Sequence, residues 1–297
     1  MATIILLPIA AYFLGTPPND KQVDVIFKTA WGLAAVVLLT FVVGHLTGNV
    51  SQTDKLWSIV PAPYAWYMTA LGDWNERMVL MSIVVTIWAT RLTFNFARRS
   101  GYSWKFWEGE EDYRWEVLRQ RPGFSNPIVW MLFNLLFICF YQNTLIFLFT
   151  LPIVTSLSEN AQPIGMIDYA LAAAYVGLVL IEFIADQQQY NFQTEKYHRI
   201  HAGEEMGPYA DGFVQTGLWS VVRHPNYAAE QTIWIVFYLF SVAATGEWIN
   251  WSIAGCVLLV ILFKGSSDFS EEISAKKYPN YTAYQQSVGR FFPKLFK

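Results

Sequence analysis

The chain has 297 residues, of which 54% are hydrophobic, only 14% are charged and 13 are tryptophans. This composition lies far from that of a soluble domain and indicates a polytopic membrane protein. The formal net charge of −3 and the gathering of basic residues in loops argue against a nucleic-acid partner. The two cysteines, Cys139 and Cys256, lie in apolar segments, so no disulfide framework is indicated.

Apolar runs predict an all-α membrane bundle of seven or eight spans, because a span needs about 20 predominantly apolar residues. The first run, from Ile4 to Tyr12, lacks a basic flank and a cleavage signature, so we expect a short helix there and no signal peptide. Pro61 and Pro63 interrupt the third run, which we expect to line a cavity. The predicted spans are residues 3–14, 25–46, 56–71, 78–97, 127–151, 163–186, 227–245 and 248–264.

Basic residues predict the orientation of the bundle, since Lys and Arg favour the cytoplasmic side of short loops. The segment 98–126 is basic, whereas 152–162 and 246–250 contain no Lys or Arg. We therefore expect 98–126, 187–226 and the tail after residue 264 to be cytosolic. Eight spans would place the N-terminus in the cytosol as well, and seven would not. No repeat or linker divides the chain, which predicts one integral membrane domain over residues 1–297.

Three charged residues are expected inside the cytosolic half of the membrane. The charge-free runs 78–90 and 169–181 are too short to span alone, so completing them brings Arg91, Glu182 and Asp186 into the bilayer. Intramembrane charges are expensive and usually functional. A snorkelling side chain is the competing interpretation of Arg91. Glu182 and Asp186 are four residues apart and share a helix face.

The segment 217–230, GLWSVVRHPNYAAE, carries the densest polar signal. Pro225 suits the first position of a helix, where its missing N–H is not needed. From that start Asn226, Glu230 and Trp234 recur every four residues and lie on one stripe. The helix N-terminus favours an anionic ligand group. Ordinary capping explains the proline and the asparagine, but it does not explain Glu230 one turn into an apolar helix.

Other kinds of site find less support in the sequence. The four histidines are His45, His198, His201 and His224. We interpret His198 and His201 as loop residues and predict no metal site. No GxSxG signature indicates a hydrolase. No strand-bound GxGxxG is present, so any dinucleotide must bind outside a Rossmann fold.

From about residue 50 to its end the chain resembles the membrane-bound steroid 5-alpha-reductase superfamily, and within it a branch of uncharacterised 3-oxo-5-alpha-steroid 4-dehydrogenase-like proteins. The motif RHPNY followed by Glu230 is typical of the superfamily, although isoprenylcysteine carboxyl methyltransferases and sterol reductases resemble it too. The other matching blocks are TDKLWS (53–58), IWATRL (87–92), the arginine pair at 98 and 99, EEDYRW (110–115), EFIADQQ (182–188) and KKYPNYTAYQQSVGRFFP (276–293).

The resemblance implies a bundle whose cytosolic half encloses NADPH and transfers hydride to a polarised C=C bond of a lipid-like substrate, such as a sterol or an enone. It implies that Asn226 and Glu230 hold the nicotinamide end, and that arginine guanidinium groups contact the phosphates. We expect NADPH and not NADH only because these arginines are present and because of the resemblance. The predicted cofactor-binding residues are Arg91, Arg98, Arg99, Arg114, Glu182, Asp186, Arg223, His224, Asn226, Tyr227 and Glu230.

On the substrate side the resemblance implies a catalytic set of Asp54, Tyr64 and Tyr67. Asp54 with Pro61 corresponds to the family's acidic residue and following proline, and Tyr64 or Tyr67 would donate a hydrogen bond to a substrate carbonyl. A tyrosine near the end of a span is also a common interfacial anchor. The chain departs from the steroid reductases between residues 263 and 271, where their C-terminal Arg, His and Tyr spacing has no counterpart.

Two alternatives remain open. The first is an S-adenosylmethionine-dependent methyltransferase related to isoprenylcysteine carboxyl methyltransferases, indicated by RHPNY and by Glu271 and Glu272 ahead of the tail tyrosines. The second is a non-catalytic lipid binder whose charges only set topology. The sequence leaves the substrate and the oligomeric state open. In a eukaryotic host we expect the endoplasmic reticulum membrane.

Overall fold

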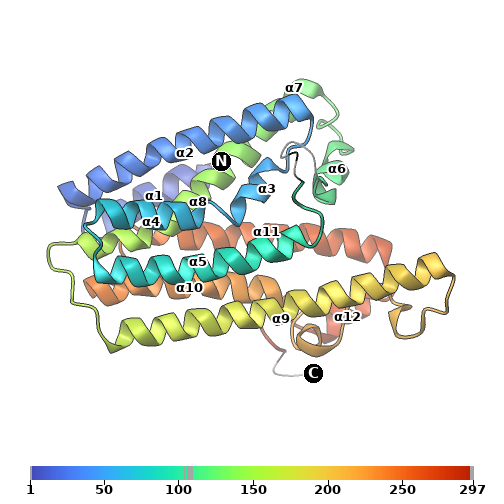
Figure 1. Cartoon of the computed structure of the whole chain (residues 1–297). Coiled ribbons are helices and arrows are strands. Elements are labelled where there is room, and N and C mark those ends of the chain that lie inside the picture. Colours follow the sequence, from blue (N-terminus) through green and yellow to red (C-terminus); the bar gives the residue numbers. More distant parts are fainter. Residues whose placement is uncertain (1, 104, 106–109, 295–297) are drawn as a thin grey trace. The chain divides into compact units, whose positions relative to one another are not determined.

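The structure is a computed structural model that describes residues 2–103, 105 and 110–294 (Figure 1). The all-α prediction is confirmed, because every regular element within those residues is a helix. The helices are α1 (Ala2–Leu14), α2 (Asp20–Thr47), α3 (Gln52–Trp57), α4 (Pro61–Leu71), α5 (Glu76–Ala97), α6 (Tyr113–Arg119), α7 (Pro127–Phe133), η1 (Asn134–Tyr141), α8 (Gln142–Thr150), η2 (Leu151–Leu157), α9 (Met166–Ala202), η3 (Gly207–Tyr209), η4 (Gly217–Ser220), α10 (Pro225–Thr245), α11 (Ile253–Lys277) and α12 (Tyr281–Ser287).

Among the described residues, six helical segments are long and apolar enough to cross a membrane, so the chain is a multi-pass integral membrane protein. Two of the eight predicted segments form shorter helices: α1 has 13 residues and α4 has 11. At about 1.5 Å per residue both fall well short of a hydrocarbon core of about 30 Å. The six are α2, α5, the continuous segment Pro127–Leu157, α9, α10 and α11.

The third predicted segment, 56–71, is two helices and not one. α3 ends at Trp57 and α4 begins at Pro61. Pro61 has no N–H with which to continue the hydrogen bonding of α3, but it fits the first position of a new helix. The prolines therefore divide this segment.

Helix α9 is longer than predicted. The expected span stopped at residue 186, with a loop to follow, but the helix continues to Ala202. No glycine or proline occurs between Asp186 and Gly203, whose φ of 68° ends the helix. The placement of His198 and His201 in a loop was therefore wrong, because both lie in the last turns of α9. Helix α11 likewise continues past residue 264 to Lys277, just before Pro279.

The chain folds as two compact units. Unit 1 contains Met1–Val176 and Trp234–Leu259, and unit 2 contains Gly177–Ile233 and Val260–Lys297. Helices α9, α10 and α11 each belong partly to unit 1 and partly to unit 2. The expectation of a single domain stays a prediction.

Unit 1 is a bundle of antiparallel helices in which α2, α4 and α5 pack together (Figure 1). Its core is aromatic: the ring of Trp234 lies 5.0 Å from Trp88 and 4.0 Å from Phe149. Trp234, which the sequence placed on the polar stripe of α10, is thus a core residue with 1% of its surface exposed. The long membrane segment 127–157 contains the π-helical stretch η1, a distortion often found at functional sites.

Unit 2 joins the C-terminal part of α9 to the segment before α10. Trp219 Nε1 donates to the Ala185 carbonyl at 3.1 Å, and the Leu218 N–H donates to Gln188 Oε1 at 2.9 Å. The aromatic residues Phe213, Tyr281 and Tyr284 form a second small core under α12. These contacts fix the loop that precedes α10 against α9.

Candidate functional site

The first turn of α10 is built as the sequence predicts. Pro225 is its first residue, and the Ala228 N–H donates to the His224 carbonyl at 2.9 Å. The ring of His224 stacks on Tyr227 with 5.4 Å between centroids, and Tyr227 meets Phe263 edge to face. His224 therefore contacts the first turn of α10 with both its backbone carbonyl and its ring.

A polar cluster joins this turn to α9. Asn226 Nδ2 donates to Asp186 Oδ1 at 3.2 Å. The two helices run in opposite directions (Figure 1), so one turn beyond this bond in the same direction lie Glu182 on α9 and Glu230 on α10. Glu182, Asp186 and Glu230 are all buried, with 4%, 3% and 3% of their surfaces exposed. The structure therefore brings Asn226 and Asp186 together, with Glu182 and Glu230 buried one turn further along the same two helices.

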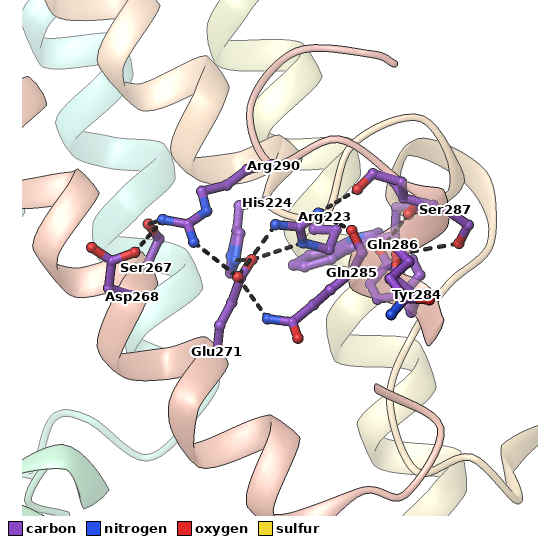
Figure 2. A network of polar contacts seen from close by, with 12 residues as sticks. Arg223, His224, Ser267, Asp268, Glu271, Tyr284, Gln285, Gln286, Ser287 and Arg290 are labelled. Atoms are coloured by element: carbon purple, nitrogen blue, oxygen red, sulfur yellow. Dashed lines mark hydrogen bonds and ion pairs between the residues drawn. The ribbon is translucent and has the colours of Figure 1, made fainter. Parts of the chain in front are cut away.

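Glu271 is the centre of a second polar cluster in unit 2, which the sequence did not predict (Figure 2). Its carboxylate accepts hydrogen bonds from Arg223 Nε at 2.8 Å, from His224 Nε2 at 2.9 Å, from Gln285 Nε2 at 2.9 Å and from Arg290 Nη2 at 3.0 Å. Only 3% of Glu271 is exposed. A carboxylate so deeply buried is retained only with several donors around it, a condition met here.

Arg290 extends this cluster along α11. Its Nη1 donates to Ser267 Oγ at 3.2 Å and also pairs with Asp268. Asp268 and Glu271 are three residues apart and share a helix face, so one guanidinium spans both acids. That spacing is a local sign of the cluster in the sequence, but it does not identify the distant partners of Glu271.

The C-terminal tail runs beside the segment before α10. The Arg223 N–H donates to the Gly289 carbonyl at 2.8 Å, and the His224 N–H donates to the Arg290 carbonyl at 3.1 Å. Val222 and Gly289 form an isolated parallel β-bridge. The hydroxyl of Tyr284 donates to the carbonyl of Trp219. Backbone and side chains of the tail thus hold both residues that precede Pro225.

The predicted catalytic residues lie in unit 1. Asp54 is on α3, and Trp115 Nε1 donates to its Oδ2 at 2.9 Å. Burial raises the pKa of Asp54, and the nearby charge of Asp112 raises it further, against the opposing charge of Arg114. The folded protein therefore keeps the proton on Asp54 to a higher pH than an unfolded chain does, and a protonated carboxyl donates a hydrogen bond as well as accepting one.

The structure distinguishes the two candidate tyrosines. Tyr64 is buried, with 6% of its surface exposed, and its hydroxyl has no hydrogen-bond partner among the described residues. Tyr67 is 48% exposed. A buried hydroxyl with no partner carries a free-energy penalty, so Tyr64 is the better candidate for a hydrogen bond to a ligand.

The four predicted phosphate-binding arginines also belong to unit 1. Arg91 is buried within α5. Arg98 Nε donates to Asn95 Oδ1 at 3.0 Å, and Arg99 Nη2 reaches the same oxygen at 3.4 Å. Arg114 forms an ion pair with Asp112 at 2.7 Å. Arg98 and Arg99 therefore both donate to the side-chain amide oxygen of Asn95.

Unit 1 holds a further buried polar group that the sequence gave no reason to single out. Asn143 Nδ2 donates to the Cys139 carbonyl at 2.7 Å and to Thr40 and Thr53 at 3.3 Å each. Thr53 precedes Asp54 on α3, and Cys139 lies within the π-helical η1. Non-local packing of α2, α3 and α8 assembles this group.

The chain is similar to known proteins over most of its length. Residues 40–288 match the family described as a protein of unknown function, DUF1295. An uncharacterized protein of Schizosaccharomyces pombe is 34% identical over 280 residues, which covers 87% of this chain and 79% of that protein. No solved structure matches the chain.

Proposed function

This chain belongs to the DUF1295 family of proteins of unknown function, and we propose from its own residues that it is a membrane-bound, NADPH-dependent reductase of lipid-like enones. Hydride would add to a C=C bond that is polarised by a neighbouring carbonyl group. The resemblance of the RHPNY segment to the steroid 5-alpha-reductase superfamily supports this reaction.

The observation that carries the proposal is the hydrogen bond between Asn226 and Asp186, with Glu182 and Glu230 buried one turn away. A nicotinamide carboxamide offers N–H donors and a carbonyl acceptor. Carboxylates and an amide supply the complementary acceptors and donors. The residues present in unit 2 therefore fit a nicotinamide group, which supplies the hydride when NADPH is bound.

The resemblance implies that Tyr64 or Asp54 supplies the acid that the reaction needs. The buried Tyr64 hydroxyl is a donor whose partner would be the substrate carbonyl oxygen, and that bond would strengthen as negative charge develops there. The raised pKa of Asp54 makes its protonated carboxyl a second candidate. Either group would stabilise the enolate oxygen by a hydrogen bond, and the α-carbon would take its proton from solvent water.

The methyltransferase alternative is less well supported. It depends partly on Glu271, whose carboxylate already accepts hydrogen bonds from four side chains and so has little capacity left for a sulfonium ligand.

The basic segment 98–126 supports an orientation with that segment in the cytosol. In a eukaryotic host we propose the endoplasmic reticulum membrane as its location.

The test is a titration of detergent-purified protein with NADPH and, separately, with S-adenosylmethionine. Wild type is compared with Asn226→Ala and Glu230→Gln, and Gln187→Ala serves as a matched control on the neighbouring helix. We expect NADPH to bind wild type and Gln187→Ala but neither site variant. A panel of enones then identifies a substrate by the oxidation of NADPH. Binding of S-adenosylmethionine without NADPH would instead support a methyltransferase, and binding of neither would contradict both.

A further inference from the structure

Most of the N–H donors of the Arg223 guanidinium are used by contacts within the protein. Its Nε and Nη2 donate to the two oxygens of Glu271 at 2.8 and 3.3 Å. Its Nη1 donates to the Gln285 carbonyl at 2.9 Å and also to the carbonyl of Val288. A guanidinium has five N–H donors, so four of them are used. With one N–H donor remaining, the guanidinium of Arg223 cannot form a bidentate pair of hydrogen bonds with a phosphate or carboxylate ligand.

His224 is constrained in the same way. Its Nε2 lies 2.9 Å from Glu271 Oε1, its backbone N–H donates to the Arg290 carbonyl, and its carbonyl receives the first hydrogen bond of α10 from Ala228. Both residues before Pro225 are therefore held from the side of α11 and the tail (Figure 2). What they hold in turn is the first turn of α10, with Asn226 and Glu230.

We infer that Glu271, Arg290 and the tail residues 284–290 form a clasp, and that this clasp positions Asn226 and Glu230 for ligand binding. Glu271 and Arg290 are positioning residues in this arrangement. Arg223 and His224 transmit the clasp to α10 and do not themselves contact the ligand. The inference rests on the proposed function only where it names NADPH as the ligand.

The backbone of the tail is matched to this role. A side-chain carbon on Gly289 would collide with the Phe292 carbonyl oxygen. Gly289 is also the residue whose carbonyl accepts from Arg223 and which bridges to Val222. A glycine at this position therefore allows the tail to turn back sharply while remaining bonded to the segment before α10.

Charge also favours a clasp over a ligand site at Glu271. Glu271 pairs with both Arg223 and Arg290, and Asp268 pairs with Arg290 and with Lys264, so the two carboxylates are neutralised by the protein's own cations without an external ion. Removing the charge of Glu271 would leave Arg223, which is 8% exposed, buried without its carboxylate. Breaking a buried pair in this way is far more disruptive than changing an exposed one.

The experiment compares Glu271→Gln with Glu272→Gln, its neighbour on the same helix, which pairs with Lys276 at the surface. Hydrogen exchange of the Arg223, His224 and Ala228 amides and NADPH binding are both measured. We expect exchange to accelerate and the NADPH dissociation constant to rise roughly tenfold or more in Glu271→Gln. Glu272→Gln should match wild type in both. Gly289→Ala supplies an independent variant and should behave as Glu271→Gln does.

A double-mutant cycle separates positioning from general destabilisation. If Glu271 acts through Asn226, the double variant of Glu271→Gln with Asn226→Ala should lose less NADPH affinity than the sum of the losses in the two single variants. Additive losses, or normal amide exchange in Glu271→Gln, would overturn the clasp. If wild type binds no NADPH, the proposed function fails, while the exchange measurements still decide whether the clasp holds α10.

Discussion

Asn226 and Asp186 are 40 positions apart in the chain, and a hydrogen bond of 3.2 Å between Nδ2 and Oδ1 joins them within unit 2. The bond connects the first turn of α10 to the interior of α9, where Glu182 lies one turn away. Through this contact the RHPNY segment becomes part of the candidate site. The amide and the carboxylate also hold each other in a defined orientation, which a ligand site requires.

Removing this bond should weaken ligand binding. We expect Asp186→Ala to raise the NADPH dissociation constant by roughly ten- to a hundredfold, because a hydrogen bond to a charged group is lost and Asn226 loses its orientation. Asp186→Asn keeps an acceptor oxygen and should fall between Asp186→Ala and wild type. Calorimetric titration measures both. Equal affinity in Asp186→Ala and wild type would contradict a role for Asp186.

The two tyrosines of α4 allow a controlled test of the acid. Tyr64→Phe should lower the rate of enone reduction by roughly a hundredfold, because the donor to the developing oxyanion is removed, while NADPH affinity stays unchanged. Tyr67→Phe, at the exposed position, should leave the rate at the wild-type level. Because the Tyr64 hydroxyl lacks a partner among the described residues, Tyr64→Phe should not lower the melting temperature. A loss of both rate and stability would point to a structural role.

The pKa of Asp54 predicts a dependence of stability on pH. Burial and the charge of Asp112 raise this pKa above its ordinary value of 3.8, so the folded state favours the protonated acid. The stability from this group is complete below the ordinary pKa and is lost as pH rises through the folded-state pKa. Asp54→Asn should therefore melt at a higher temperature than wild type at neutral pH, and the difference should shrink toward about pH 4.

Asp112 is the matched control with the opposite sign. Burial raises its pKa, but the hydrogen bonds and charge of Arg114 outweigh burial, and the pKa lies below its ordinary value. Its contribution to stability is present above the ordinary pKa and is lost as pH falls through the folded-state pKa. Asp112→Asn should melt below wild type at neutral pH and converge with it in acid. Parallel behaviour of the two variants would contradict this assignment.

The sequence predicted those features that depend on local chemistry. The start of α10 at Pro225 is predictable because proline has no N–H, which the first position of a helix does not need. The membrane-spanning helices are predictable because the thickness of the membrane sets the length of their apolar runs. The sequence did not distinguish Tyr64 from Tyr67. Lipid and the protein interior are both apolar, so the periodicity of a sequence does not tell a lipid-facing residue from a buried one. The length of α9 was underestimated because the polar residues after Asp186 were taken for a loop.

The role of Glu271 was hidden for a different reason. Its partners Arg223, Gln285 and Arg290 come from segments up to 48 positions away, and pairing between distant segments leaves no periodic signal in one sequence. The resemblance covered the tail but assigned it no function. Only the return of residues 284–290 beside Arg223 reveals what the tail holds.

The ion pair between Arg77 and Asp168 in unit 1 predicts a large effect on stability. Both side chains are 3% exposed, with Arg77 Nε 2.7 Å from Asp168 Oδ1. Arg77 also donates to the carbonyls of Gln162 and Pro163 at 2.8 and 3.0 Å, and the Gly165 N–H donates to Asp168. This pair therefore fixes the connection that leads into α9. Arg77→Met should destabilise the protein by about 3–5 kcal/mol, because it leaves a buried carboxylate without its partner.

The matched control is Lys21→Met, which removes the ion pair to Asp73, where the side chains are 50% and 83% exposed. Solvent screens such a pair, so we expect no change in the melting temperature. The double variant Arg77→Met with Asp168→Leu should recover part of the loss, because no charge is left buried, but the carbonyls of Gln162 and Pro163 stay without the arginine. Thermal unfolding in detergent measures all three variants. A melting temperature of Arg77→Met equal to that of Lys21→Met would show that the connection into α9 is held by other contacts, because burial is what distinguishes the two pairs.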